Sequence, residues 1–230
     1  MVRDRTLCRG LHSDTLHLAT RTRSGDRVFR RGSEIYVEGE ACGDVFNLLD
    51  GIVGLYMSLS DGARQITDIL MPGTTFGWQE LDTAAPVTHT AFCLTDVSVC
   101  VMPKSKAVRL MHEEPEVMMA QLVAAGRDNE RLQEGIVNLG RRRAGKRLAH
   151  FFAMFARRYR ETFSGHPVHA PIPVPMSQEL IGEALGITSV HVSNQLRELR
   201  ERGMIEYVNR QLVIRDGLWG GDRARVECEY

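Results

Sequence analysis

The 230-residue sequence lacks any long apolar run. No segment approaches the roughly 18 uncharged apolar residues that a membrane-spanning helix needs, so we expect no contact with a membrane. The first residues, MVRDRTLCRGLHSD, include basic side chains but no apolar stretch behind them, which is not the pattern of a secretory signal. We therefore expect a cytoplasmic protein. Apolar residues make up 43% and charged residues 25%, a composition typical of globular domains, and the length allows two of them.

Cysteines are few, and they are not arranged in pairs. None of the five forms a CxxC spacing, which argues against a disulfide framework and against a zinc ribbon. We interpret most of them as buried thiols with no redox or cluster role. They are Cys8, Cys42, Cys93, Cys100 and Cys228.

Short apolar stretches alternate with Gly, Asp and Ser from about residue 27 to residue 111. The turn signals Asp50-Gly51, Asp61-Gly62 and Pro72-Gly73 recur at intervals of about ten residues, which is typical of an all-β sandwich or jelly roll. We expect residues 20–112 to form a β-roll sensor domain. The spacing does not determine the topology of its strands.

The motifs of common enzyme classes are missing as well. The sequence has no P-loop, no nucleophile elbow and no GxGxxG followed by an acidic residue. Jelly-roll dioxygenases of the cupin type need two His and a Glu at close spacing to hold their metal, whereas residues 27–111 contain one histidine, His89. We therefore expect neither an enzyme nor a metal site.

A helix is predicted from Pro115 to about Leu139, within a segment, 113–140, that we assign to dimerisation. Its apolar positions alternate in steps of four and three over three heptads, the pattern of a coiled-coil seam. A lone Asn at such a position can fix register and a two-stranded state. A helix packed only on its own domain is the alternative. The predicted seam is Met118, Leu122, Ala125, Asn129, Leu132, Ile136 and Leu139.

Residues 141–217 contain the strongest pattern in the sequence. After a helical stretch, AGKRLAHFFAMFARRYRE, a proline-rich segment predicts a loop or short edge strand. Ser177 is then placed to cap one helix and Thr188 the next, with Gly186 at the turn between them, which is a helix-turn-helix. The stretches MIEYV and QLVIRD around Asn209-Arg210 read as a β-hairpin wing. Residues 218–230 are a tail.

The second of these helices carries the predicted DNA-reading face. Burial of Val192, Leu196 and Leu199 would turn outward a mixture of hydroxyl, amide, guanidinium and methyl groups suited to base edges. We expect base contacts from Ser189, Val190, Ser193, Asn194 and Arg197, and phosphate contacts from Thr188 and His191.

Charge supports a polyanionic partner for this half of the chain. Residues 139–217 hold 13 Lys and Arg against 7 Asp and Glu, whereas residues 1–138 hold 14 against 19, although the whole chain has a formal charge of zero. A winged helix that binds protein instead of double-stranded DNA is the alternative.

The chain resembles the Crp-Fnr superfamily of bacterial transcription regulators, which are related to the cyclic-AMP receptor protein. The resemblance covers about residues 20–217 and rests on EGEACGDVFNLLDGIVGLY, SDGARQITDILMPGTTFG and ELIGEALGITSVHVSNQLRELRERGMI. It implies an α+β chain in the order β-roll, long dimerisation helix and winged helix-turn-helix. It further implies a cytoplasmic homodimer that binds a near-palindromic operator and contacts RNA polymerase.

This sequence departs from the family pattern at the effector pocket. Where cyclic-AMP binders have a Gly-Glu pair for the ribose and an Arg-Ser pair for the phosphate, it has Gly77-Trp78 and His89-Thr90. The hydroxyl residues that would touch adenine become Leu132 and Gln133. We therefore expect no control by cyclic AMP. An aromatic or weakly acidic effector in the altered pocket is one alternative, and a Trp78 that simply fills the space of a constitutively active protein is the other.

Two further departures limit what the resemblance carries over. The iron-sulfur branch of the family holds its cluster on several N-terminal cysteines, and only Cys8 lies there, so no cluster is expected. The DNA-reading helix has Val190 and Asn194 where the best-known members have Glu and Arg, so their operator sequence does not transfer. A small-molecule sensor that acts through protein contacts, without binding DNA, remains the alternative function.

Overall fold

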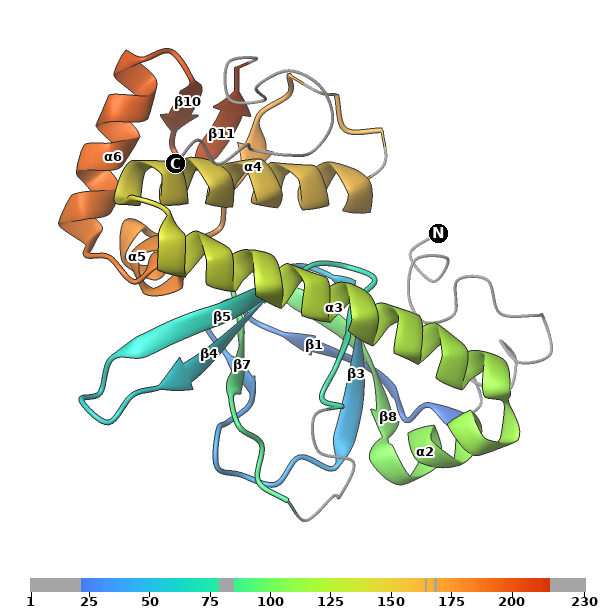
Figure 1. Cartoon of the computed structure of the whole chain (residues 1–230). Coiled ribbons are helices and arrows are strands. Elements are labelled where there is room, and N and C mark those ends of the chain that lie inside the picture. Colours follow the sequence, from blue (N-terminus) through green and yellow to red (C-terminus); the bar gives the residue numbers. More distant parts are fainter. Residues whose placement is uncertain (1–21, 79–84, 164, 168, 216–230) are drawn as a thin grey trace. The chain divides into compact units, whose positions relative to one another are not determined.

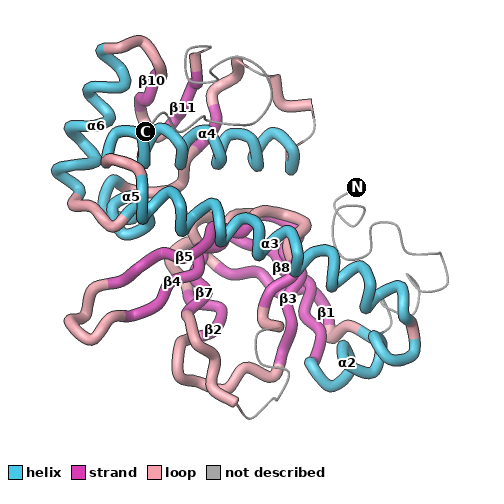
Figure 2. Tube along the Cα trace, viewed as in Figure 1, coloured by secondary structure: helices cyan, strands magenta, loops and turns pink. Residues whose placement is uncertain are grey.

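The computed structural model describes residues 22–78, 85–163, 165–167 and 169–215 (Figure 1). The chain divides into two compact units, Met1–Leu132 and Gln133–Tyr230, and the division falls inside one long helix. Strands dominate the first unit and helices the second (Figure 2). The mixed α+β fold class is therefore confirmed. Cys8, Cys228 and the tail 218–230 lie outside the described residues.

The first unit is a roll of two four-stranded antiparallel sheets. One sheet has the order β1-β8-β3-β6 and the other β2-β7-β4-β5. Glycines at the three predicted turns, Gly51, Gly62 and Gly73, all have positive φ, which other residues rarely adopt. The strands are β1 Gly25–Phe29, β2 Glu34–Tyr36, β3 Asp44–Asp50, β4 Val53–Ser58, β5 Arg64–Leu70, β6 Thr75–Phe76, β7 Thr90–Cys93 and β8 Val97–Pro103.

The core of the roll lies between the inner faces of these strands. In β8, Val97, Val99 and Val101 are buried and alternate with half-buried Ser98 and Cys100, as the two-residue period of a strand requires. An aromatic group from three other strands completes the core, with the rings of Phe46 and Phe76 stacked 5.2 Å apart and Tyr36 beside both.

One helix in this region was not predicted. The expected strand-rich segment extended to residue 111, but α2 occupies Lys104–Glu113. Pro103 is its N-cap residue, and Ala107 and Leu110, three residues apart, bury one face of it against Val45. The helix is only ten residues long and buries few side chains, so its apolar period is too short to distinguish it from the strands before it.

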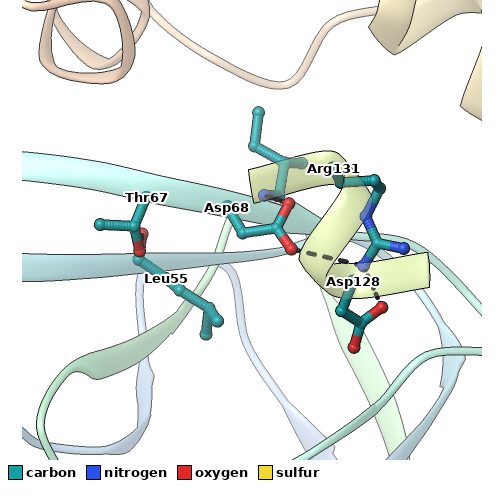
Figure 3. A network of polar contacts seen from close by, with 6 residues as sticks. Leu55, Thr67, Asp68, Asp128 and Arg131 are labelled. Carbon is teal, nitrogen blue, oxygen red and sulfur yellow. Dashed lines mark hydrogen bonds and ion pairs between the residues drawn. The ribbon is translucent and has the colours of Figure 1, made fainter. Parts of the chain in front are cut away.

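The long helix α3, Pro115–Arg141, confirms the predicted helix within two residues at its C-terminal end. It contacts the roll through buried Val117, which packs in an apolar cluster with Val45, and through an ion pair (Figure 3). The Nη2 atom of Arg131 lies 3.5 Å from Asp68 on β5 and 2.5 Å from Asp128 on α3 itself. Because Arg131 and Asp68 are only 23% and 16% exposed, this pair is shielded from solvent screening and fixes which face of α3 meets the roll.

The second unit contains three further helices and a small sheet. It comprises α4 Ala144–Thr162, β9 Ile172–Pro173, α5 Gln178–Leu185, α6 Ser189–Glu201, β10 Ile205–Val208 and β11 Gln211–Ile214. The two hairpin strands pair antiparallel, and β11 also pairs with β9, so the sheet order is β10-β11-β9. The proline-rich segment thus provides the short edge strand that was expected.

Candidate nucleic-acid interface

The helix-turn-helix is built from the predicted caps. The Ser177 hydroxyl accepts a hydrogen bond from the Leu180 N–H at 3.2 Å, and the Thr188 hydroxyl accepts one from the His191 N–H at 3.3 Å. Gly186 ends α5 in the left-handed conformation at φ 61°. These three residues place α6 directly after a tight turn, as the sequence predicted.

Helix α6 buries one face and exposes the other. Val192, Leu196 and Leu199 are buried, as predicted. The expected base-contacting residues on the opposite side are exposed, with the exception of Ser189, which is half-buried at the start of the helix. Exposed on this face are Val190, Ser193, Asn194 and Arg197, together with the predicted phosphate contacts Thr188 and His191.

The polar groups on this face are available to a ligand. Arg197 has only a 3.9 Å ion pair with Glu201, in which both side chains are 70% exposed. Such exposed pairs contribute about 0–1 kcal/mol, so DNA can displace them at little cost. The Thr188 hydroxyl lies 2.9 Å from His191 Nδ1, which orients both side chains at the start of α6.

The β10–β11 hairpin forms the predicted wing and, together with the helices, a groove that the sequence did not predict. Asn209 and Arg210 both have positive φ, 51° and 60°, which is the geometry of a type I′ turn and confirms the predicted wing. Between the wing and the helices lies a groove of about 540 Å³. Its lining residues are Met176, Ser177, Gln178, Ser193, Leu196, Arg197, Arg200, Tyr207, Asn209 and Arg210.

Three arginines from two separate elements therefore line one groove. Arg197 and Arg200 are one helical turn apart on α6, and Arg210 comes from the wing. The three-residue spacing of the first two was a signal in the sequence. The approach of the wing to α6 is a tertiary contact that no local pattern reveals. The cluster gives this surface of the second unit a strong positive charge.

The predicted dimer seam is exposed on α3. Leu122 and Ile136 are 64% and 69% exposed, and Met118 and Leu132 are 45% and 46% exposed. Ala125 and Asn129 are also exposed, whereas Leu139 is half-buried. Met119, Val123 and Val137 are exposed apolar residues outside the predicted seam. The predicted seam therefore exposes a row of apolar side chains on α3, a feature typical of a surface that contacts another apolar surface.

The residues of the predicted effector pocket lie in different surroundings. Trp78 packs with the apolar group of Val45, Leu110 and Val117 near α2. His89 and Thr90 belong instead to the interior of the roll, where they are 7% and 1% exposed. Gln133, like Leu132, is exposed on α3. Sequence position placed these residues in a shared pocket, but it could not show which side of the sheet each side chain faces.

The polar groups at the phosphate position are already bonded within the protein. His89 Nε2 lies 2.7 Å from the Tyr36 hydroxyl, and the Thr90 hydroxyl accepts the Glu38 N–H at 2.9 Å. Burial lowers the pKa of His89 below its ordinary value, against an opposing effect of Glu38, and so favours the uncharged imidazole. Burial likewise raises the pKa of Tyr36, which keeps its hydroxyl protonated.

This arrangement does not fit a cyclic nucleotide. A buried phosphate needs a cation, whereas the predicted phosphate position offers the imidazole of His89, whose Nε2 is already bonded to Tyr36 and whose pKa is lowered by burial. The ribose position offers the indole of Trp78 in place of a carboxylate. At Gly77, a Cβ would lie 2.9 Å from the Asp44 carbonyl oxygen, so the backbone here is packed closely.

Comparisons with known proteins agree with the fold and with both types of domain. The cyclic nucleotide-binding domain family matches residues 26–114, and the Crp-like helix-turn-helix domain family matches residues 146–217. The nitrogen fixation regulation protein FixK of Azorhizobium caulinodans is 29% identical over 190 residues, covering 82% of this chain and 75% of that protein. FixK of Bradyrhizobium diazoefficiens is 28% identical over 228 residues, covering 99% and 90%. The structure of FixK2 from Bradyrhizobium japonicum superposes with a TM-score of 0.75 and 28% identity, covering 87% of this chain and 98% of that one.

The β-roll followed by a winged helix-turn-helix with an exposed polar helix defines a DNA-binding transcription regulator. The chain belongs to the Crp-Fnr family. Among the described residues, no helix is long and apolar enough to cross a membrane.

Proposed function

We propose that the protein binds a near-palindromic operator as a homodimer, with α6 of each protomer in the major groove. The observation that carries this proposal is the exposed polar face of α6 beside the groove lined by three arginines. Asn194 is suited to adenine, Arg197 to guanine, and the Val190 methyl groups to a thymine methyl. Thr188 and His191, at the start of the helix, are suited to phosphate.

The arginines of the groove between the wing and α6 allow DNA binding to be tested through its salt dependence. We expect Arg200→Ala and Arg210→Ala to weaken binding uniformly across DNA sequences, because phosphate contacts carry no sequence information. Each change should reduce the slope of log affinity against log salt by about 0.9, the value for one neutralised phosphate. Fluorescence anisotropy with a labelled duplex over a range of salt concentrations measures this slope.

Arg202→Ala is the matched control for this experiment. Arg202 is exposed at the end of the same helix, but it pairs with Glu198 and does not line the groove. Its removal should leave the salt slope unchanged. The alternative function, a sensor that acts only through protein contacts, requires that the wild-type protein show no salt-dependent binding to duplex DNA, and that result would overturn the proposal.

The second part of the proposal is that α3 makes the dimer. The exposed apolar stripe from Met118 to Ile136 supports it, because a second copy of the same stripe covers it symmetrically. Asn129 then lies at a seam position where it can select a two-stranded pairing. By family resemblance, the dimer acts in the cytoplasm through RNA polymerase and has no catalytic activity of its own.

The third part is that operator binding needs no cyclic nucleotide. The His89–Tyr36 and Thr90–Glu38 hydrogen bonds close the interior of the roll, and Arg131 holds α3 on Asp68. We expect titration with cyclic AMP to leave Trp fluorescence unchanged and operator affinity unchanged within about twofold, because a ligand shifts a conformational equilibrium only through differential binding. Cyclic-AMP binding that improves operator affinity would contradict this. A metabolite panel tested in the same way addresses an aromatic or acidic effector.

A further inference from the structure

A single arginine joins the end of the proposed dimer helix to the helix-turn-helix. Arg147 lies in the first turn of α4, and its guanidinium group donates hydrogen bonds to three backbone carbonyl oxygens. Nη1 donates to Leu185 at 2.7 Å, and Nη2 donates to Leu139 at 2.8 Å and to Arg142 at 3.3 Å. The acceptors come from the end of α3, the residue after it, and the last residue of α5.

These acceptors have a chemical need for such a donor. The last carbonyls of a helix have no partner within it, and the aligned peptide dipoles give them a partial negative charge. At Arg147, the C-terminal ends of α3 and α5 meet one cation. A planar guanidinium with several fixed N–H groups can serve both ends at once, whereas a lysine ammonium on a flexible chain cannot hold the same three directions.

Neighbouring contacts make the joint stiffer. Asn138, which is buried, donates from Nδ2 to the Arg147 carbonyl oxygen at 3.3 Å and accepts from Arg142 Nη1 at 3.3 Å. On the other side, α4 approaches α6 closely, since a Cβ at Gly145 would lie 2.3 Å from the Gln195 side chain. Through these contacts, the C-terminal end of α3 is tied to α5 by Arg147 and to α4, which itself packs closely against α6.

We propose that Arg147 is a positioning residue that sets the distance and angle between the two recognition helices of the dimer. The inference rests on the proposed function. If α3 of each protomer lies at the dimer seam, the angle at which α3 enters the helix-turn-helix determines where α6 meets DNA. A rigid joint makes the dimer selective for one spacing of half-sites, and a loose joint lets it bind several spacings.

The test compares half-site spacings on DNA that the wild-type protein has itself selected from a random pool. Duplexes are made with the half-sites moved apart or together by one or two base pairs, together with a duplex that carries a single half-site. Each added base pair turns one half-site by about 35° around the helix axis, so a rigid dimer should lose roughly tenfold or more in affinity. For Arg147→Met, the same change in spacing should lower the affinity only about threefold. The two helix-turn-helix domains of the dimer can then reach half-sites at several spacings.

Affinity for the single half-site separates positioning from folding. If Arg147 acts by position, Arg147→Met should bind the single half-site within about twofold of wild type, since α6 itself is intact. Arg143→Met is the matched control, because Arg143 is exposed at the N-cap of the same helix and its side chain makes no capping hydrogen bond. It should keep the wild-type spacing profile. Arg147→Lys, which keeps the charge, should flatten the profile as methionine does, and it decides the question if the methionine variant does not fold.

A wild-type spacing profile in folded Arg147→Met or in Arg147→Lys overturns the inference. An equal loss of affinity of the Arg147 variants for every duplex, including the single half-site, also overturns it, because Arg147 would then only maintain the fold. Failure of the wild-type protein to select any two-part site would instead overturn the proposed function, so the two failures can be told apart.

Discussion

Replacing Leu132 and Ile136 with glutamate is expected to convert the dimer into monomers that no longer bind the operator tightly. The two side chains are 46% and 69% exposed on α3, so the substitutions cost the protomer little of its own stability. In the dimer, they would put four carboxylates into an apolar seam, which strongly opposes association. Because two linked half-sites gain about 10²–10⁴-fold in affinity over one, operator binding should fall by that factor. Sedimentation and operator titration measure the two effects.

Arg127→Glu provides the control for this experiment. Arg127 is exposed on α3 but lies outside the seam, so reversing its charge should leave the protein dimeric. If the Leu132 and Ile136 variant also remains dimeric with unchanged operator affinity, α3 does not make the dimer. The exposed apolar residues outside the predicted seam are Met119, Val123 and Val137.

Truncation of Asn194 or Arg197 to alanine is expected to cost roughly 1–3 kcal/mol of operator binding for each half-site. Both side chains are exposed on the face of α6 opposite its buried residues, where a base edge can reach them. Loss of one base contact should also relax sequence preference at one position of each half-site. Selection of duplexes by each variant, compared with wild type, shows both the loss and the relaxed position.

The effect on sequence preference distinguishes base contacts from phosphate contacts. Lower affinity with an unchanged sequence preference would assign Asn194 and Arg197 to phosphate, contrary to the prediction. Arg202→Ala again serves as the control, because Arg202 follows the last residue of α6 and does not line the groove. It should change neither affinity nor preference.

The helix-turn-helix was predictable because its signals are local. Ser177, Gly186 and Thr188 specify helix ends through their own side chains or backbone conformation, and the buried stripe of α6 follows from helical spacing. The wing was predictable for the same reason, since Asn209 tolerates the positive φ of a tight turn.

Features that depend on packing between distant segments were not predictable. Arg200 and Arg210 meet in one groove only after the wing folds toward α6, and Arg147 meets its three carbonyls only where two helices end together. The packing of Trp78 beside Val117 of α3 and the hydrogen bond of His89 to Tyr36 are likewise contacts between distant segments. Ser189 is half-buried because it begins a helix whose first turn packs against its neighbour.

Operator binding by the dimer is tested most directly by selection of bound duplexes from a random pool, with the full chain and no added ligand. We expect enrichment of a two-part, near-palindromic sequence whose half-sites lie about one helical turn, 10–10.5 base pairs, apart. Enrichment should not change when cyclic AMP is added. A pool that remains random after repeated selection, with no salt-dependent retention of any duplex, would contradict the account.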